Sequence, residues 1–174
     1  MGAWNIPSRR EDDHLSLLSS EFKRLNIGIA AIFEVQRLDS GEIMVGGYTY
    51  YLSGRSDACH AQGVSVAVSN KLTPMISAVT PVNECIMRLR ICHCLGVIPL
   101  VSVYAPTEAG NLTVKDAFES VVDQCPRQDT LLVLRDFTAS TGTGRGGYDT
   151  CVGPHGSETV NQNSTKFLVF ARSH

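Results

Sequence analysis

The sequence predicts a layered α/β domain in which helices cover a stack of mixed β-sheets. Two stretches place apolar residues at helical spacing, and several shorter stretches alternate or run continuously apolar, as strands do. Apolar residues make up 43% and charged residues 18% of the 174 residues. This composition can build a core and excludes a disordered chain. Because no repeat or long linker divides the chain, we expect a single domain over residues 1–174.

The first half of the chain is predicted to hold one helix followed by strands. The helix is expected within residues 11–26, where apolar residues recur at helical spacing: Leu15, Leu18, Phe22 and Leu25. A short apolar run over residues 27–35 then predicts a buried strand. Residues 48–52, which follow a Gly-Gly turn, and the alternating valines of residues 63–68 predict two more.

The second half is predicted to continue with a strand pair, a helix and a central strand. Residues 87–91 alternate apolar side chains with Arg88 and Arg90, and a tight connection at Leu95-Gly96 leads to a paired strand over residues 97–104. Helical spacing returns over residues 111–125. The continuous apolar run Leu131–Leu134 predicts a strand over residues 130–137 that is buried on both faces. A loop and a last helix over residues 161–171 are expected to follow.

Charge and targeting signals restrict the partners and the compartment. With 15 Lys and Arg against 17 Asp and Glu, the net charge is -2, so any contact with nucleic acid must come from a local patch. No apolar stretch is long enough to span a bilayer, and residues 4–13 contain no apolar core of a signal peptide. The sequence therefore predicts no membrane interaction and an intracellular location, nuclear or cytoplasmic.

Two motif-like stretches favour ordinary structure over ligand binding. The run Cys92-His93-Cys94 lacks the usual zinc spacing and a second pair, so these cysteines and Cys85 are expected to act as small hydrophobic residues in strands. Residues 142–147 satisfy G-x-G-x-x-G, but no helix is predicted directly after them. We therefore expect a loop and no dinucleotide cofactor. Arg145 and Arg135 are candidates for phosphate contacts, although exposed arginines are usually only solvated.

Three polar residues stand where apolar strands are predicted to end: Glu34, Tyr104 and Asp136. In layered α/β folds, ligands gather beyond the carboxyl ends of strands. If these strands are neighbours, Glu34 and Asp136 converge and can hold Mg²⁺ together with a substrate phosphate, and Tyr104 can donate to a phosphate oxygen or to an attacking water. These residues alone also allow the alternative that Glu34 and Asp136 are solvated turn residues and that Tyr104 serves only in packing.

The chain also resembles a known family through segments that occur in the family's order. They are Trp4-Asn5, IFEVQRL at 32–38, GVSVAV at 63–68, SVYAPT at 102–107, LRDFT at 134–138 and Asn161-Gln162-Asn163. Together they resemble the endonuclease/exonuclease/phosphatase superfamily, and within it the endonuclease domains of LINE-type retrotransposons and the craniofacial-development protein 2-like proteins derived from them.

The resemblance implies a four-layer α/β sandwich that hydrolyses phosphodiester bonds of nucleic acid, here DNA, with Mg²⁺ or alternatively Mn²⁺. It implies that Glu34, with Asn5, binds the metal, and that Tyr104 and Asp136 are catalytic. Asn5, Tyr104 and Thr138 would contact the substrate.

The sequence departs from the family pattern at the end of that site. Arg135-Asp136-Phe137-Thr138 stands where the family has Gly-Asp-Phe-Asn, so Thr138 lacks the amide of the usual Asn and the long side chain of Arg135 is expected to enter a tight site. The family's final Ser-Asp-His segment would lie beyond residue 174, and His174 is not assigned its role. The resemblance therefore implies a domain truncated at its C-terminus, with an exposed sheet edge.

These departures leave three functions open. The first is a degenerate, retrotransposon-derived endonuclease-like domain that, if active, hydrolyses nucleic acid with Mg²⁺. The second is a non-catalytic module on the same scaffold that binds nucleic acid or a protein. The third is a partly folded chain without an evolved function.

Overall fold

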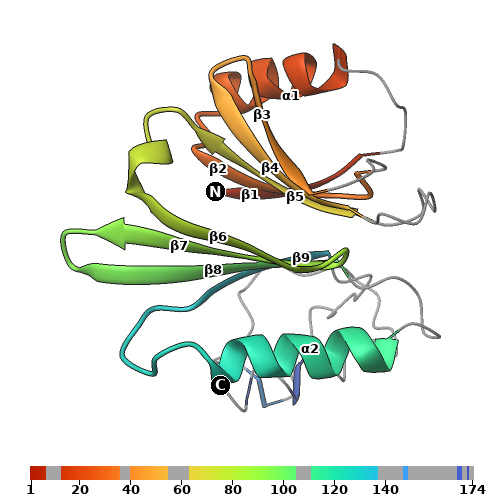
Figure 1. The fold of residues 1–174 in the computed structure, drawn as a ribbon, viewed down its shortest axis with the longest axis vertical. Coiled ribbons are helices and arrows are strands. Elements are labelled where there is room, and N and C mark those ends of the chain that lie inside the picture. The colour runs from red at the N-terminus through yellow and green to blue at the C-terminus, as the bar shows by residue number, and fades with distance from the viewer. Residues whose placement is uncertain are drawn as a thin grey trace. The chain divides into compact units, whose positions relative to one another are not determined.

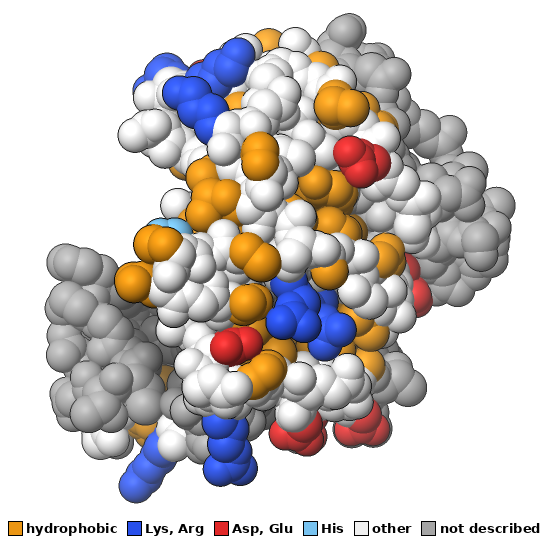
Figure 2. Space-filling model, turned by 60° about the vertical axis from the view of Figure 1, so that its left-hand side comes forward, with side chains coloured by type: hydrophobic (Ala, Val, Ile, Leu, Met, Phe, Trp, Pro, Cys, Tyr) orange, Lys and Arg blue, Asp and Glu red, His pale blue; other side chains and the backbone are white. Residues whose placement is uncertain are grey.

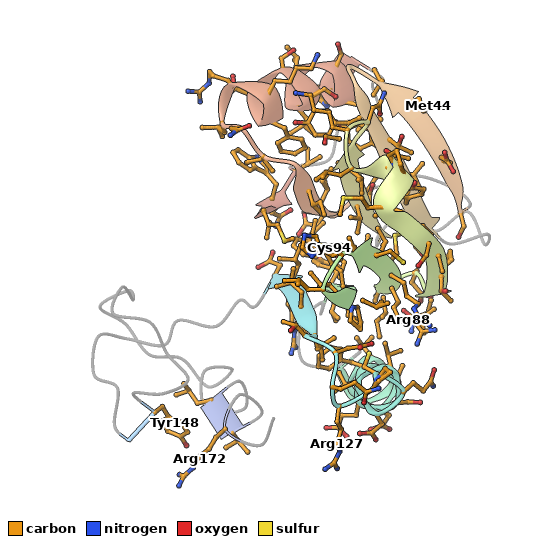
Figure 3. All side chains as sticks on the ribbon, turned by 90° about the vertical axis from the view of Figure 1, so that its left-hand side faces the viewer. Met44, Arg88, Cys94, Arg127, Tyr148 and Arg172 are labelled. Atoms are coloured by element: carbon orange, nitrogen blue, oxygen red, sulfur yellow. The ribbon has the colours of Figure 1, made fainter. Side chains whose placement is uncertain are left out.

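The structure is a computed structural model that describes residues 1–6, 13–35, 40–54, 63–104, 111–136, 147–148, 168–169 and 172. It divides into two compact units, Met1–Asp136 and Phe137–His174. In the second unit, the guanidinium carbon of Arg172 lies 5.9 Å from the ring centre of Tyr148 (Figure 3). The single domain expected over residues 1–174 stays a prediction.

The first unit carries the sheets and their covering helices. Its elements in chain order are β1 (Gly2–Asn5), α1 (Asp13–Arg24), β2 (Ile29–Phe33), β3 (Gly41–Val45), β4 (Tyr48–Gly54), β5 (Gly63–Ser69), η1 (Thr73–Met75), β6 (Ile76–Asn83), β7 (Ile86–His93), β8 (Gly96–Tyr104), α2 (Asn111–Asp123) and β9 (Leu132–Asp136).

These strands form two mixed sheets. Sheet I has the order β1-β2-β5-β4-β3, and sheet II has the order β6-β7-β8-β9. β1 runs parallel to β2 and β9 parallel to β8, whereas the other neighbours are antiparallel. Figure 1 shows α1 over one side of sheet I, the two sheets face to face, and α2 beyond sheet II. The layered α/β domain predicted from the residues and the four-layer sandwich implied by the family resemblance are both confirmed.

The core between the sheets comes from alternate residues of facing strands. Successive side chains of a strand point to opposite faces, so every second residue enters this layer. Its fully or almost fully buried members are Ile29, Ala31, Phe33, Tyr51, Val64, Val66, Val68, Met87, Leu89, Ile91 and Leu100. The alternation read from residues 63–68 and 87–91 therefore marks the two faces of β5 and β7.

Each helix buries one apolar face against the outer side of a sheet. On α1, Leu15 and Phe22 pack with Ala30, Ile32 and Tyr50 of sheet I. On α2, the buried side chains are Phe118, Val121 and Val122. α1 ends at Arg24 and the chain turns through a left-handed residue, Asn26, at a φ of 54°. Leu25, which fits the helical spacing in the sequence, follows the helix end and is exposed.

Strand β9 differs from the strand predicted by its sequence. Among the described residues it is the last strand of sheet II, and all five of its residues are half-buried. The prediction of full burial on both faces is wrong for the described part of the chain, because an apolar run does not show whether a second neighbouring strand is present.

The three cysteines on either side of β7, Cys85 before it and Cys92 and Cys94 near its end, also differ from expectation. Cys85 is buried, but Cys92 and Cys94 are exposed. Cys92 lies near the end of β7, and Cys94 lies in the turn that connects β7 to β8 (Figure 3). The expectation that all three act as small hydrophobic residues is therefore wrong for Cys92 and Cys94.

Some expectations concern residues beyond those described. Most of the predicted helix over 161–171 and of the G-x-G-x-x-G stretch over 142–147 lies outside the described residues, as do Thr138 and Arg145. No helix in the described ranges is long and apolar enough to cross a membrane.

Candidate active site

Four strands end at the same place between the two sheets. In sheet I, Asn5 at the end of β1 is the register partner of Phe33 at the end of β2. In sheet II, Tyr104 at the end of β8 is the register partner of Asp136 at the end of β9. Parallel pairing brings the carboxyl ends of both members of each pair to the same level. The side chains at these ends can therefore meet across the gap between the sheets.

Hydrogen bonds join these side chains into what we call the strand-end cluster, Asn5, Glu34, Tyr104 and Asp136. Asn5 Nδ2 donates to Glu34 Oε1 at 3.3 Å and to Asp136 Oδ2 at 3.3 Å. Tyr104 Oη donates to the same Glu34 Oε1 at 3.1 Å. Asn5 is exposed, and the other three are half-buried. The cluster thus combines two carboxylates with two uncharged donors at the solvent-accessible edge of the core.

Tyr104 is held from both sheets. Its ring stacks on that of Phe33, with centroids 6.2 Å apart and planes 23° from parallel. Its backbone N–H donates to the carbonyl of Cys85 at 2.8 Å. The pKa of Tyr104 is raised to about 12, first by burial and then by the hydrogen bond and charge of Glu34 and the charge of Asp136. Tyr104 therefore keeps its proton at neutral pH and acts as a hydrogen-bond donor.

Glu34 has a backbone conformation that is costly for a residue with a side chain. Its φ of 62° lies in the left-handed region, which disfavours non-glycine residues by roughly 1–3 kcal/mol. Hydrogen bonds hold the residues on both sides of it. The N–H of Ile6 donates to the carbonyl of Phe33 at 3.3 Å, and the N–H of Val35 donates to the carbonyl of Gly63 at 3.2 Å. Strain of this kind persists where the surrounding structure fixes it, which is common at functional sites.

No protein-family profile and no curated protein matches this sequence. Solved structures do match its fold. The endonuclease domain of TRAS1, a telomere-specific non-LTR retrotransposon, is 17% identical with a TM-score of 0.65, and the match covers 98% of this chain and 68% of that one. The AP endonuclease LMAP from Leishmania major is 10% identical with a TM-score of 0.57, covering 97% and 63%.

A third match carries the name of the superfamily. An endonuclease/exonuclease/phosphatase family protein from Leptotrichia buccalis C-1013-b is 12% identical with a TM-score of 0.52, covering 79% of this chain and 66% of that one. The chain has the endonuclease/exonuclease/phosphatase fold. It spans between 63% and 68% of the lengths of these three structures.

Within this endonuclease/exonuclease/phosphatase fold, Arg135 lies away from the cluster. Its strand neighbour Asp136 reaches Asn5 in sheet I, and adjacent strand residues face opposite sides, so Arg135 faces the outer side of sheet II. Burial there lowers the pKa of Arg135 to about 10. The expectation that its side chain enters the site is wrong, because strand alternation decides its direction. Thr138, expected to contact substrate, is not among the described residues.

On the face drawn in Figure 2, the charged side chains of the described residues do not gather into a patch of a single sign. Figure 2 shows Lys and Arg scattered among Asp and Glu over the described residues of that face. On the outer side of sheet II, Arg88 extends toward α2, where its Nη1 donates to Gln124 Oε1 at 3.5 Å (Figure 3). Arg88 therefore contacts the helix end and not the strand-end cluster.

The donor set of the cluster fits a hard divalent cation. Mg²⁺ in proteins is usually bound by one or two carboxylates, with waters and substrate phosphate oxygens as the other ligands. Glu34 and Asp136 supply such carboxylates, and the exposure of Asn5 leaves room for waters. No group of three or more His, Cys, Asp and Glu that could hold a metal occurs within the described ranges, so zinc-type ligation has no candidate there.

Two supporting residues were not singled out from the sequence. Phe33 supports the Tyr104 ring, and Gly63 accepts the hydrogen bond from Val35. Phe33 lies in a stretch predicted as a buried strand and Gly63 in one predicted as a half-buried strand, and an aromatic residue or a glycine is ordinary in such places. The supporting role of Phe33 is visible only in its contact with Tyr104 of the other sheet. That of Gly63 is visible only in the close approach of its backbone to that of Val35.

Proposed function

We propose that this chain is a retrotransposon-derived, nuclease-like domain that binds Mg²⁺ and a phosphodiester of nucleic acid at the strand-end cluster. The observation that carries the proposal is the double hydrogen bond of Asn5 Nδ2 to Glu34 and Asp136, with Tyr104 bonded to the same Glu34 oxygen. The matched solved structures support it because two of them, the TRAS1 endonuclease domain and the AP endonuclease LMAP, are endonucleases with this fold.

Each residue of the cluster has a role that its chemistry allows. Glu34, with Asn5, holds the metal, which when bound neutralises negative charge on the phosphate. The Asn5 amide and the Tyr104 hydroxyl are neutral donors that can bind phosphate oxygens. The carboxylate of Asp136 can accept a hydrogen bond from a water and orient it toward phosphorus.

The proposed activity is slow, because the cluster has no histidine in the described part of the chain. Of the described histidines, His14 lies on α1. His93 lies at the end of β7 far from the cluster, because it pairs with Gly96 at the start of β8, whereas Tyr104 is at the end of β8. Without an imidazole as general acid or base, a hydrolase loses roughly 10²–10⁴-fold in rate. We therefore propose a degenerate enzyme with low turnover.

Nicking of supercoiled plasmid tests the proposal. The purified chain is incubated with plasmid in Mg²⁺ and in EDTA, alongside Glu34→Ala and the matched control Glu42→Ala, an exposed glutamate of β3. We expect slow nicking that requires Mg²⁺, is lost in Glu34→Ala and is kept in Glu42→Ala.

Other outcomes decide against the enzyme. Saturable plasmid binding without nicking in any metal favours the non-catalytic binding module. Neither nicking nor binding, with a cooperative unfolding transition, would overturn both. Equal nicking by wild type and Glu34→Ala would point to a contaminating nuclease.

A further inference from the structure

The register between β2 and β5 changes at the candidate metal ligand. Along these strands each residue of β2 pairs regularly with β5, ending with Phe33 opposite Val64. Continued in the same way, Glu34 would lie opposite Gly63. Instead the N–H of Val35 donates to the carbonyl of Gly63, one residue out of register. Glu34 and Val35 thus lie opposite a single residue, as in a β-bulge, and Glu34 takes the left-handed position.

A β-bulge redirects the side chain at its first residue. In bulges of this kind the left-handed residue is usually glycine. Here it is Glu34, whose carboxylate accepts hydrogen bonds from Asn5 and Tyr104. The irregularity therefore coincides with the residue whose direction matters most for the cluster.

Gly63 leaves the space that this bulge needs. A Cβ added to Gly63 would overlap the carbonyl oxygen of Val35 and lie 3.2 Å from its carbonyl carbon. It would also lie 3.5 Å from the carbonyl oxygen of Ser53 on the other side. Because both neighbours are backbone atoms, no side-chain rotation can relieve the overlap. A side chain at Gly63 must therefore move Val35.

We propose that Gly63 is a positioning residue that fixes the direction of the Glu34 carboxylate through its close approach to Val35. The missing side chain lets the backbone of Val35 lie against β5, and this contact holds the left-handed turn at Glu34. Displacing Val35 turns the Glu34 carboxylate away from Asn5 and Tyr104. The consequence for metal binding and nicking rests on the proposed function, but the consequence for the contact between Glu34 and Tyr104 does not.

The ionisation of Tyr104 reports on this contact without any metal or substrate. The chain is labelled at tyrosine Cζ and titrated by NMR from about pH 9 to 12, with Tyr104→Phe assigning the signal. In wild type the Tyr104 pKa is expected near 12. In Gly63→Ala we expect the Tyr104 pKa to fall only part of the way toward its ordinary value, because burial still raises it whereas the hydrogen bond and charge of Glu34 no longer do. Mg²⁺-dependent nicking is expected to fall roughly 100-fold in parallel.

The matched control is Gly41→Ala. A Cβ on Gly41, also a strand residue of sheet I, meets nothing within 4 Å. We expect the Tyr104 pKa of Gly41→Ala to equal that of wild type. An unchanged Tyr104 pKa in Gly63→Ala, or an equal fall in Gly41→Ala, would overturn the inference.

A second variant covers the case in which Gly63→Ala does not fold cooperatively. Val35→Pro lacks the N–H that donates to Gly63, so it breaks the same contact from the other strand. The same fall of the Tyr104 pKa is expected, and its absence contradicts the inference. If wild type does not nick plasmid while the Tyr104 pKa responds as expected, the proposed function fails and the role of Gly63 stands.

Discussion

The hydroxyl of Tyr104 donates to Glu34 Oε1 across the gap between the two sheets, over 3.1 Å. Tyr104 ends β8 of sheet II and Glu34 directly follows β2 of sheet I, so the bond ties the sheets together at the point where both strands stop. Its strength depends on Tyr104 remaining protonated.

Tyr104→Phe tests the pH range of this bond. Below about pH 10 the tyrosine is protonated in both the folded and the unfolded chain, and between about 10 and 12 only the unfolded chain ionises. The unfolding free energy of wild type therefore falls over this window, and Tyr104→Phe lacks that part of the fall. At pH 9 we expect the variant to lose about 1 kcal/mol for the missing hydrogen bond. Urea unfolding of wild type and Tyr104→Phe at pH 9 and 11.5 measures the loss at pH 9 and the fall with pH. An equal fall of the unfolding free energy in the two proteins would contradict a raised pKa at Tyr104.

Asn5→Asp tests the charge of the cluster. The amide of Asn5 bridges the carboxylates of Glu34 and Asp136, and a third carboxylate in its place adds like-charge repulsion. We expect the variant to unfold at a lower temperature in EDTA, and Mg²⁺ to raise its melting midpoint by more than it raises that of wild type. The control is Asn70→Asp, whose side-chain oxygen still accepts from Thr49. Equal Mg²⁺ shifts in all three proteins would argue against metal binding at the cluster.

Arg135→Met tests the direction of Arg135. Because this side chain faces away from Asp136, its replacement by an apolar chain of similar length should leave Mg²⁺-dependent nicking within about twofold of wild type. Asp136→Ala, the neighbouring change, should abolish it. A large loss of nicking in a cooperatively folded Arg135→Met would restore the expectation that Arg135 enters the site.

Two leucine truncations test how deeply β9 is buried. Leu100 on β8 is fully buried in the core between the sheets, so Leu100→Ala should cost about 3 kcal/mol. Leu134 on β9 packs against the same core but is only half-buried, so Leu134→Ala should cost about half as much. Urea unfolding of both variants decides the point; equal losses would mean that β9 is as well covered as β8.

The sequence predicted the strands whose apolar residues follow a simple period. The runs ending at Glu34, Tyr104 and Asp136 became β2, β8 and β9, with the polar residues at their ends. Strands β1, β3 and β6 were not predicted from the residues. β1 has four residues and is mostly exposed, β3 is largely exposed, and β6 contains Pro81 and irregular pairing. Their pairing with neighbours, and not their own pattern, makes them strands.

The residues of the candidate site were likewise only partly predicted from the sequence pattern. Strand ends pointed to Glu34, Tyr104 and Asp136, whereas Asn5 came from the family resemblance alone. The left-handed backbone of Glu34 and the closeness of Val35 to Gly63 depend on how two strands meet. Single-residue preferences carry no signal for such contacts, since glycine at the start of a strand is unremarkable.

The bond from Asn5 to Asp136 joins positions 131 residues apart. Contacts of such long range close large loops and form slowly, because their entropy cost is met only when much of the chain is already ordered. We therefore expect the strand-end cluster to form late in folding and to be absent from proteolytic fragments that lack either end of the first unit. If the cluster binds Mg²⁺ as proposed, the gain of Mg²⁺ affinity during refolding would mark the moment at which the native arrangement of the two sheets is complete.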